Sequence, residues 1–152
     1  MNYKAIFLGM LAYTAVTFPL AVIWHVVLFE ELYRTFGYFE GEPSFVLGLA
    51  TIIIQGGVLS FLYPYVGFTG NGITRGLKYS LLAGLFFWSS HVLAFVAKHV
   101  VDSSFSFVLM ESFYLLLQFG IYGILIGIIF NRSLNQKLKW PSGDNQSADP
   151  KQ

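Results

Sequence analysis

A chain of 152 residues that is 55% hydrophobic and 11% charged has too few polar side chains to cover a soluble domain, in which about a quarter of residues are charged. A formal net charge of +1 gives no sign of a clustered basic surface for nucleic acid. The absence of cysteine excludes disulfides, iron–sulfur clusters and thiol catalysis.

Four long apolar stretches follow one another along the chain, over residues 5–29, 45–63, 79–97 and 105–130. A helix needs about 20 apolar residues to cross a bilayer, and it satisfies its own backbone hydrogen bonds in lipid. We therefore predict an all-α fold, an integral membrane four-helix bundle over residues 1–135. Residues 136–152 are polar and predict a disordered cytoplasmic tail.

The first stretch is too long for the core of a signal peptide, so we expect it to be retained as a membrane helix. The segment that follows, residues 30–43, interleaves aromatic side chains with glutamates and glycines. This pattern predicts a segment lying in the membrane interface. Residues 67–72 form a glycine-rich turn between the second and third stretches.

The basic residues are distributed unevenly between the two ends of the predicted helices. Seven flank one side and two the other, which together make the 9 of the chain: Lys4, Arg75, Lys78, Arg132, Lys137, Lys139 and Lys151 against Arg34 and Lys98. Because cytoplasmic loops carry the excess of Lys and Arg, both termini are predicted to be cytoplasmic. The predicted location is the bacterial inner (plasma) membrane, with the lipid bilayer as the first partner.

Small and polar residues recur at spacings of three and four in each stretch, which predicts the faces that point into the bundle. From the first helix to the fourth, these residues are Thr14, Thr17, Ala21 and His25; Gly48, Thr51 and Gln55; Ser80, Gly84, Phe87, His91, Ala94 and Lys98; and Glu111, Gln118 and Tyr122.

Three ionisable residues lie at similar predicted depths. At 1.5 Å per residue, His25, His91 and Glu111 are roughly 6, 10 and 9 Å below the outer ends of their helices. They could therefore meet just beneath the first external loop. Gln55 and Gln118 lie deeper, where they could bond each other or extend a polar path inward. Such residues are costly in lipid and often mark functional sites.

Several chemistries fit this polar membrane cluster. A His–Glu set suits proton or cation binding, because histidine titrates near neutral pH. His25, His91 and Glu111 are also weak candidates for metal ligands, and the two histidines for haem ligands. A hydrogen-bonded cluster that only fixes helix register is equally open. The sequence assigns no cofactor.

Gly120, Gly123 and Gly127 lie on the side of the fourth helix away from Glu111. Small residues at this spacing allow close helix packing, either within the monomer or in an oligomer.

Three segments carry a resemblance to a group of known proteins: IWHVVLFEELYRTFGYF, FFWSSH and ESFYLLLQFGIYGILIG. In these the chain resembles small bacterial four-helix inner-membrane proteins grouped in families of unknown function. The resemblance implies a multi-pass inner-membrane protein and brings no activity with it.

The leading functional hypothesis is therefore a small, non-enzymatic membrane protein that binds or conducts a small cation or proton through its His/Glu cluster. One alternative is a structural or accessory subunit, either as a homo-oligomer or in a larger membrane complex. A membrane-embedded enzyme or haem protein, with a histidine as general base, is a further alternative. No nucleic-acid partner is expected.

Overall fold

The computed structural model describes residues 2–39, 41–101 and 103–138, and all regular structure in this part of the chain is helical. Four helices are long and apolar enough to cross a membrane, at Tyr3–Leu28, Phe45–Tyr65, Gly72–Lys98 and Ser104–Arg132. The prediction of an all-helical chain with four long apolar helices is thus confirmed.

Three of the four long helices change their hydrogen-bonding pattern along their length. The first and third contain π-helical turns, and the second ends in a short 3₁₀ turn. In chain order the elements are α1 (Tyr3–Ala21), η1 (Val22–Leu28), α2 (Glu30–Thr35), α3 (Phe45–Leu62), η2 (Tyr63–Tyr65), α4 (Gly72–Trp88), η3 (Ser89–Leu93), α5 (Ala94–Lys98) and α6 (Ser104–Leu138).

Two helix boundaries differ from those expected from hydropathy. The third long helix begins at Gly72 rather than at residue 79, because the Asn71 side chain caps it by accepting a 2.8 Å hydrogen bond from the Thr74 backbone N–H. Helix α6 continues to Leu138, so the predicted tail begins inside it and residues 136–138 are helical. The remainder of that predicted tail, residues 139–152, lies outside the described residues.

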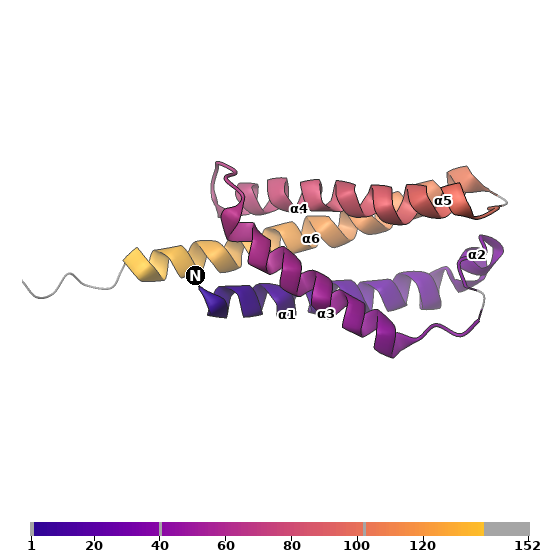
Figure 1. The fold of residues 1–152 in the computed structure, drawn as a ribbon, viewed down its shortest axis with the longest axis horizontal. Helices are drawn as coiled ribbons and strands as arrows, with labels where there is room; N and C mark the ends of the chain where they lie inside the picture. The colour runs from indigo at the N-terminus through magenta and orange to yellow at the C-terminus, as the bar shows by residue number, and fades with distance from the viewer. Residues whose placement is uncertain (1, 40, 102, 139–152) are drawn as a thin grey trace, which may run out of the picture.

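The long helices pack in the order α4, α6, α1, α3, with the most extensive contacts between α4 and α6 and between α1 and α3. In Figure 1, α3 crosses α1 obliquely. The N-terminus, the α3–α4 connection and the C-terminal part of α6 lie at one end of the molecule, and α2 and α5 lie at the other.

Helix α3 is attached to the α4–α6 pair near its C-terminal end. The Tyr79 hydroxyl donates a 2.7 Å hydrogen bond to the Leu59 carbonyl, and Ser60 Oγ lies 3.1 Å from the Tyr122 hydroxyl. Over the rest of its length α3 packs mainly on α1. The four helices therefore form an open row rather than a closed bundle.

Glycines allow α4 and α6 to approach closely. A Cβ atom on Gly76 would lie 2.8 Å from backbone atoms of Gly127, and one on Gly123 would lie 2.9 Å from Ser80 Cβ. Of the three glycines predicted for helix packing, Gly123 and Gly127 thus contact α4 of the same chain. A Cβ on Gly120 would meet nothing within 4 Å.

One predicted surface differs from the one observed. Helix α3 buries Ile52, Gly56, Leu59 and Ser60 rather than Gly48 and Thr51, because Gly56 lets Tyr13 of α1 approach closely. The aromatic segment, which was predicted to lie in the membrane interface, packs against α6. Tyr33 and Phe36 of this segment are buried, and both rings contact Phe107 of α6.

Candidate functional site

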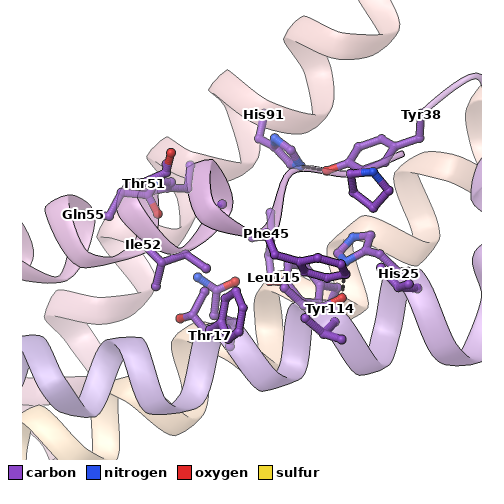
Figure 2. Close-up of a pocket in the computed structure, with 18 of the residues that line it drawn as sticks. Thr17, His25, Tyr38, Phe45, Thr51, Ile52, Gln55, His91, Tyr114 and Leu115 are labelled. Atoms are coloured by element: carbon purple, nitrogen blue, oxygen red, sulfur yellow. Dashed lines mark hydrogen bonds between the residues drawn. The ribbon is translucent and has the colours of Figure 1, made fainter. Parts of the chain in front are cut away.

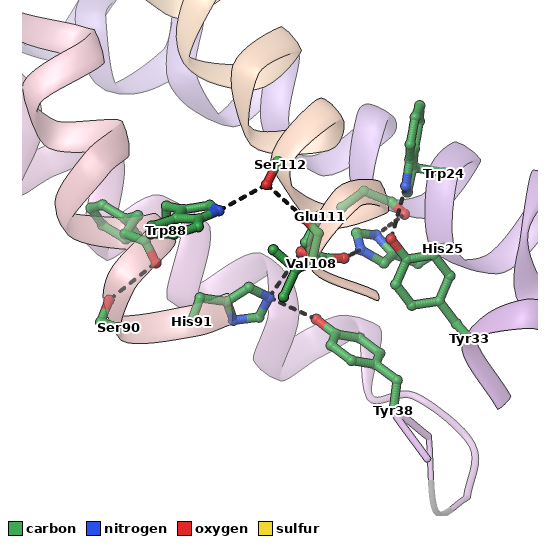
Figure 3. Close-up of polar contacts among 12 residues, drawn as sticks. Trp24, His25, Tyr33, Tyr38, Trp88, Ser90, His91, Val108, Glu111 and Ser112 are labelled. Carbon is green, nitrogen blue, oxygen red and sulfur yellow. Dashed lines mark hydrogen bonds and ion pairs between the residues drawn. The ribbon is translucent and has the colours of Figure 1, made fainter. Parts of the chain in front are cut away.

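The structure brings His25, His91 and Glu111 together from three helices (Figure 3). His25 Nε2 lies 2.8 Å from Glu111 Oε1, and His91 Nε2 lies 3.3 Å from Glu111 Oε2. The Glu111 side chain is fully buried, His25 is 9% exposed and His91 is 42% exposed. We call these three residues the His–Glu cluster. Its carboxylate is closed off, whereas one of its imidazoles remains accessible.

The hydrogen bonds of His25 restrict where its protons lie. Its Nδ1 is 3.0 Å from the Ala21 carbonyl oxygen, which can only accept, so Nδ1 carries a hydrogen. A single further proton is then shared between Nε2 and Glu111 Oε1. With that proton, the pair is neutral overall whether it is written as imidazolium and carboxylate or as imidazole and carboxylic acid.

Both histidines lie in π-helical turns, His25 in η1 and His91 in η3. Such turns are rare within α-helices and frequent at functional sites. They also change the angular relation between residues on either side of the turn. A pattern of residues at α-helical spacing therefore does not predict the direction in which these two imidazoles point.

Three tyrosine rings surround the His25 imidazole. The ring centroids of Tyr33, Tyr38 and Tyr114 lie 4.6, 5.5 and 4.6 Å from it. Two of these rings meet the imidazole edge-to-face and Tyr38 stacks on it, so the tyrosines fix the orientation of the His25 ring. Sequence analysis noted the aromatic segment that holds Tyr33 and Tyr38, but assigned it to the membrane interface.

Two of these tyrosine hydroxyls also bond groups at the site. The Tyr38 hydroxyl lies 3.1 Å from His91 Nε2, and the Trp24 indole N–H donates a 3.0 Å hydrogen bond to the Tyr33 oxygen. Burial, and secondarily the nearby Glu111 carboxylate, raise the pKa of both tyrosines above the ordinary range. Both hydroxyls therefore stay protonated and neutral near neutral pH.

Gln55 and Gln118 are joined through a residue that sequence analysis did not single out. The Tyr13 hydroxyl donates a 3.2 Å hydrogen bond to Gln55 Oε1 and accepts a 2.8 Å bond from Gln118 Nε2. Tyr13 is fully buried. The only sequence pattern that placed Tyr13 on the inward face of the first helix was its spacing of four residues from Thr17. The Tyr13–Gln55–Gln118 group shares no hydrogen bond with the His–Glu cluster among the described residues.

A pocket of about 500 Å³ connects these two polar groups (Figure 2). His25, His91 and Tyr38 line it at one end, and Gln55 and Gln118 at the other. Glu111 is not part of its wall. Gly48 and Thr51 of α3 were predicted to point into the bundle. They line this pocket and are not part of the packed core.

The pocket lies where α3 diverges from α4. Side chains of α3, including Phe45 and Ile52, form one wall, Phe87 and Ser90 on the α4 side form another, and α1 and η1 form a third. Leu115 of α6 also contributes. The pocket therefore has mainly apolar walls with polar groups at both ends, which is the usual composition of a small-molecule site.

The three residues of the His–Glu cluster do not form a metal-binding set in the described part of the chain. Both histidine Nε2 atoms point at the oxygens of one carboxylate, so they share no open position for an ion. Within residues 2–39, 41–101 and 103–138, no set of three His, Cys, Asp or Glu residues could hold a metal ion.

No family model, curated protein or solved structure matches this chain. The chain is therefore described by its own structure. It has four helices long and apolar enough to cross a membrane, and a buried His–Glu cluster beside a pocket.

Proposed function

We propose that the chain is a multi-pass protein of the bacterial inner membrane, with both termini in the cytoplasm. Four helices of sufficient length and apolar character support insertion. The excess of basic residues at the end that carries the N-terminus, the C-terminal part of α6 and the α3–α4 connection supports this orientation. The His–Glu cluster then lies in the outer half of the membrane.

Reporter fusions test this orientation. Alkaline phosphatase, which is active only outside the cytoplasm, should be inactive when fused after Arg132 and active when inserted after Gly41. Green fluorescent protein, which folds in the cytoplasm, should give the reverse result. Fluorescence from a fusion at Gly41 would contradict the orientation, and recovery of the unfused chain in the soluble fraction would contradict insertion.

We propose that the protein binds and releases a proton at the His–Glu cluster, on the outer side of the membrane. The observation that carries this proposal is the position of Glu111, fully buried between two imidazoles that line the pocket, of which His91 is the more exposed. A proton taken up from the pocket at His91 Nδ1 makes an imidazolium, whose Nε2–H can donate to Glu111 Oε2. The buried carboxylate stabilises that charge.

Binding is favoured over conduction by the composition of the inner half. Between the cluster and the cytoplasmic ends, residues 5–24, 45–62, 79–90 and 112–130 contain no Asp, Glu or His. The polar groups found there are hydroxyls and amides, among them Tyr13, Gln55 and Gln118. These groups do not titrate near neutral pH, so the proton returns to the side from which it came.

Replacing Glu111 with glutamine should move the His91 NMR titration to lower pH, because the imidazolium loses the carboxylate oxygen that lies 3.3 Å from its Nε2. The chain has 3 histidines, so each can be followed by NMR of histidine-labelled protein in nanodiscs. His99 is the internal control, since its ring nitrogen bonds only the Phe95 carbonyl in the described structure.

The two readings of the cluster give different results in this titration. Proton binding requires a His91 signal that titrates between about pH 5 and 8 in the wild type, which is the range in which histidine normally changes charge. A cluster that only fixes helix register would give no His91 titration in that range, or the same titration in Glu111→Gln. Either outcome would contradict the proposal.

A further inference from the structure

We propose that the pocket between α3 and α4 binds an amphiphile with one alkyl chain and an anionic carboxylate head, and that the head lies against His91. The proposal adds a ligand class to the proton-binding function and relies on His91 being able to protonate. It rests on the side chains that line the two parts of the pocket and on the position of α3.

The polar end of the pocket offers hydrogen-bonding groups, His25, His91 and Tyr38. His91 uses Nε2 toward Glu111 and Tyr38, and its Nδ1 makes no hydrogen bond among the described residues. A protonated His91 would therefore present one N–H to a ligand. Among the lining residues in the described part of the chain none is acidic, because the carboxylate of Glu111 lies behind the imidazoles. The complement of this end is an anion.

The N-terminus of α3 also makes this end of the pocket favourable for an anion. Pro43, Ser44 and Phe45 line the pocket, and α3 is a helix of 18 residues whose N-terminus carries a partial positive charge. No residue of α3 is titratable. The titratable groups that face His91 from the other elements are Glu111 of α6, His25 of η1 and Tyr38 of the α2–α3 connection.

The remaining wall suits an alkyl chain. Phe45, Phe87 and Leu115 contribute apolar surface, and α3 has few contacts with α4 along this wall. Phe45 is 49% exposed. A volume of about 500 Å³ lies within the range for ligands of drug size, which suits one chain better than the two chains of a phospholipid.

The test uses dodecanoic acid as the probe, with the full-length, histidine-labelled protein in phosphatidylcholine nanodiscs. The acid should shift the His91 NMR signal saturably and raise its titration midpoint by about one pH unit, because a nearby carboxylate favours the imidazolium. Dodecanol should leave the midpoint unchanged, and dodecylamine should not raise it. The His99 signal corrects for charge that the acid adds to the membrane surface.

Two glycine variants provide a matched pair. A Cβ on Gly48 or on Gly120 would meet nothing within 4 Å, yet only Gly48 lines the pocket. Gly48→Leu should weaken the apparent affinity for dodecanoic acid at least tenfold, and Gly120→Leu should leave it within twofold of the wild type. Equal loss in both variants would contradict the placement of the ligand in this pocket.

The remaining outcomes separate this proposal from proton binding. A normal His91 titration with no response to the acid would overturn the ligand and leave proton binding intact. A response to the acid without the Glu111→Gln effect would overturn proton binding and leave the pocket occupied. If dodecanoic acid and dodecanol gave the same His91 titration midpoint, the proposal of an anionic head would be overturned. If phosphatidylglycerol shifted the midpoint as much as dodecanoic acid does, the proposal of a single alkyl chain would be overturned.

Discussion

Replacing Gly76 with leucine should separate α4 from α6 and prevent the native fold. A Cβ at this position would overlap backbone atoms of Gly123 and Gly127, and backbone cannot move aside as a flexible side chain can. Overpacking in a tight core typically costs about 1–3 kcal/mol. The contact with rigid backbone places this substitution at about 3 kcal/mol or more.

The measurement is unfolding in mixed micelles, followed by circular dichroism, together with the fraction of protein that elutes as a monodisperse peak. Gly120→Leu is the control, since it adds the same side chain to a glycine of α6 that has open space around it. Gly76→Leu should lose most of its monodisperse protein while Gly120→Leu retains it. Equal behaviour of the two variants would show that close α4–α6 contact does not stabilise the fold.

A double-mutant cycle on His25 and Glu111 should give a large coupling energy. Either single leucine substitution removes one partner of a buried, hydrogen-bonded pair and leaves the other without its 2.8 Å contact, at a cost of about 2 kcal/mol. The double substitution also removes the cost of burying the pair. The double substitution should therefore destabilise the fold by only about 2.5 kcal/mol. Because the two single substitutions would cost about 4 kcal/mol if they were additive, the coupling energy is about 1.5 kcal/mol.

That value is at the upper end of polar contacts measured within membrane proteins. We expect it here because the 2.8 Å contact shares a proton between two buried groups. The control cycle combines His99→Leu with Glu111→Leu. His99 is exposed and bonds only its own helix in the described structure, so its cycle should be additive within about 0.5 kcal/mol. Additivity in the His25–Glu111 cycle as well would contradict a coupled pair.

Hydropathy was sufficient to find the four helices but not their packed faces. On α3 the apolar residues Ile53, Ile54 and Val58 are all exposed, although they are as hydrophobic as the buried Ile52 and Leu59. A helix that is apolar on every side carries no amphipathic stripe from which to read its inward face. The stripe of Gly48 and Thr51 was chosen for small and polar character, and those residues face the pocket.

Polar residues were a better guide to position than apolar ones. Glu111, Gln118 and Tyr122 were assigned to one face of the fourth helix, and all three are buried. Burying a polar group is costly unless it is bonded, so such residues point toward partners wherever the fold provides them. What the sequence could not supply was the partner, as Tyr13 between the two glutamines illustrates.

The amino-acid sequence by itself determined the number of helices, their order and a short set of polar residues that the fold must satisfy. The tertiary structure decided the rest: which oxygen of Glu111 meets which histidine, how Tyr33 and Tyr38 enclose His25, and where α3 leaves room for a pocket. Helix formation depends on local hydrogen bonds and apolar length. These contacts instead depend on the rotation and tilt of helices distant in the chain, which π-helical turns and glycine contacts set.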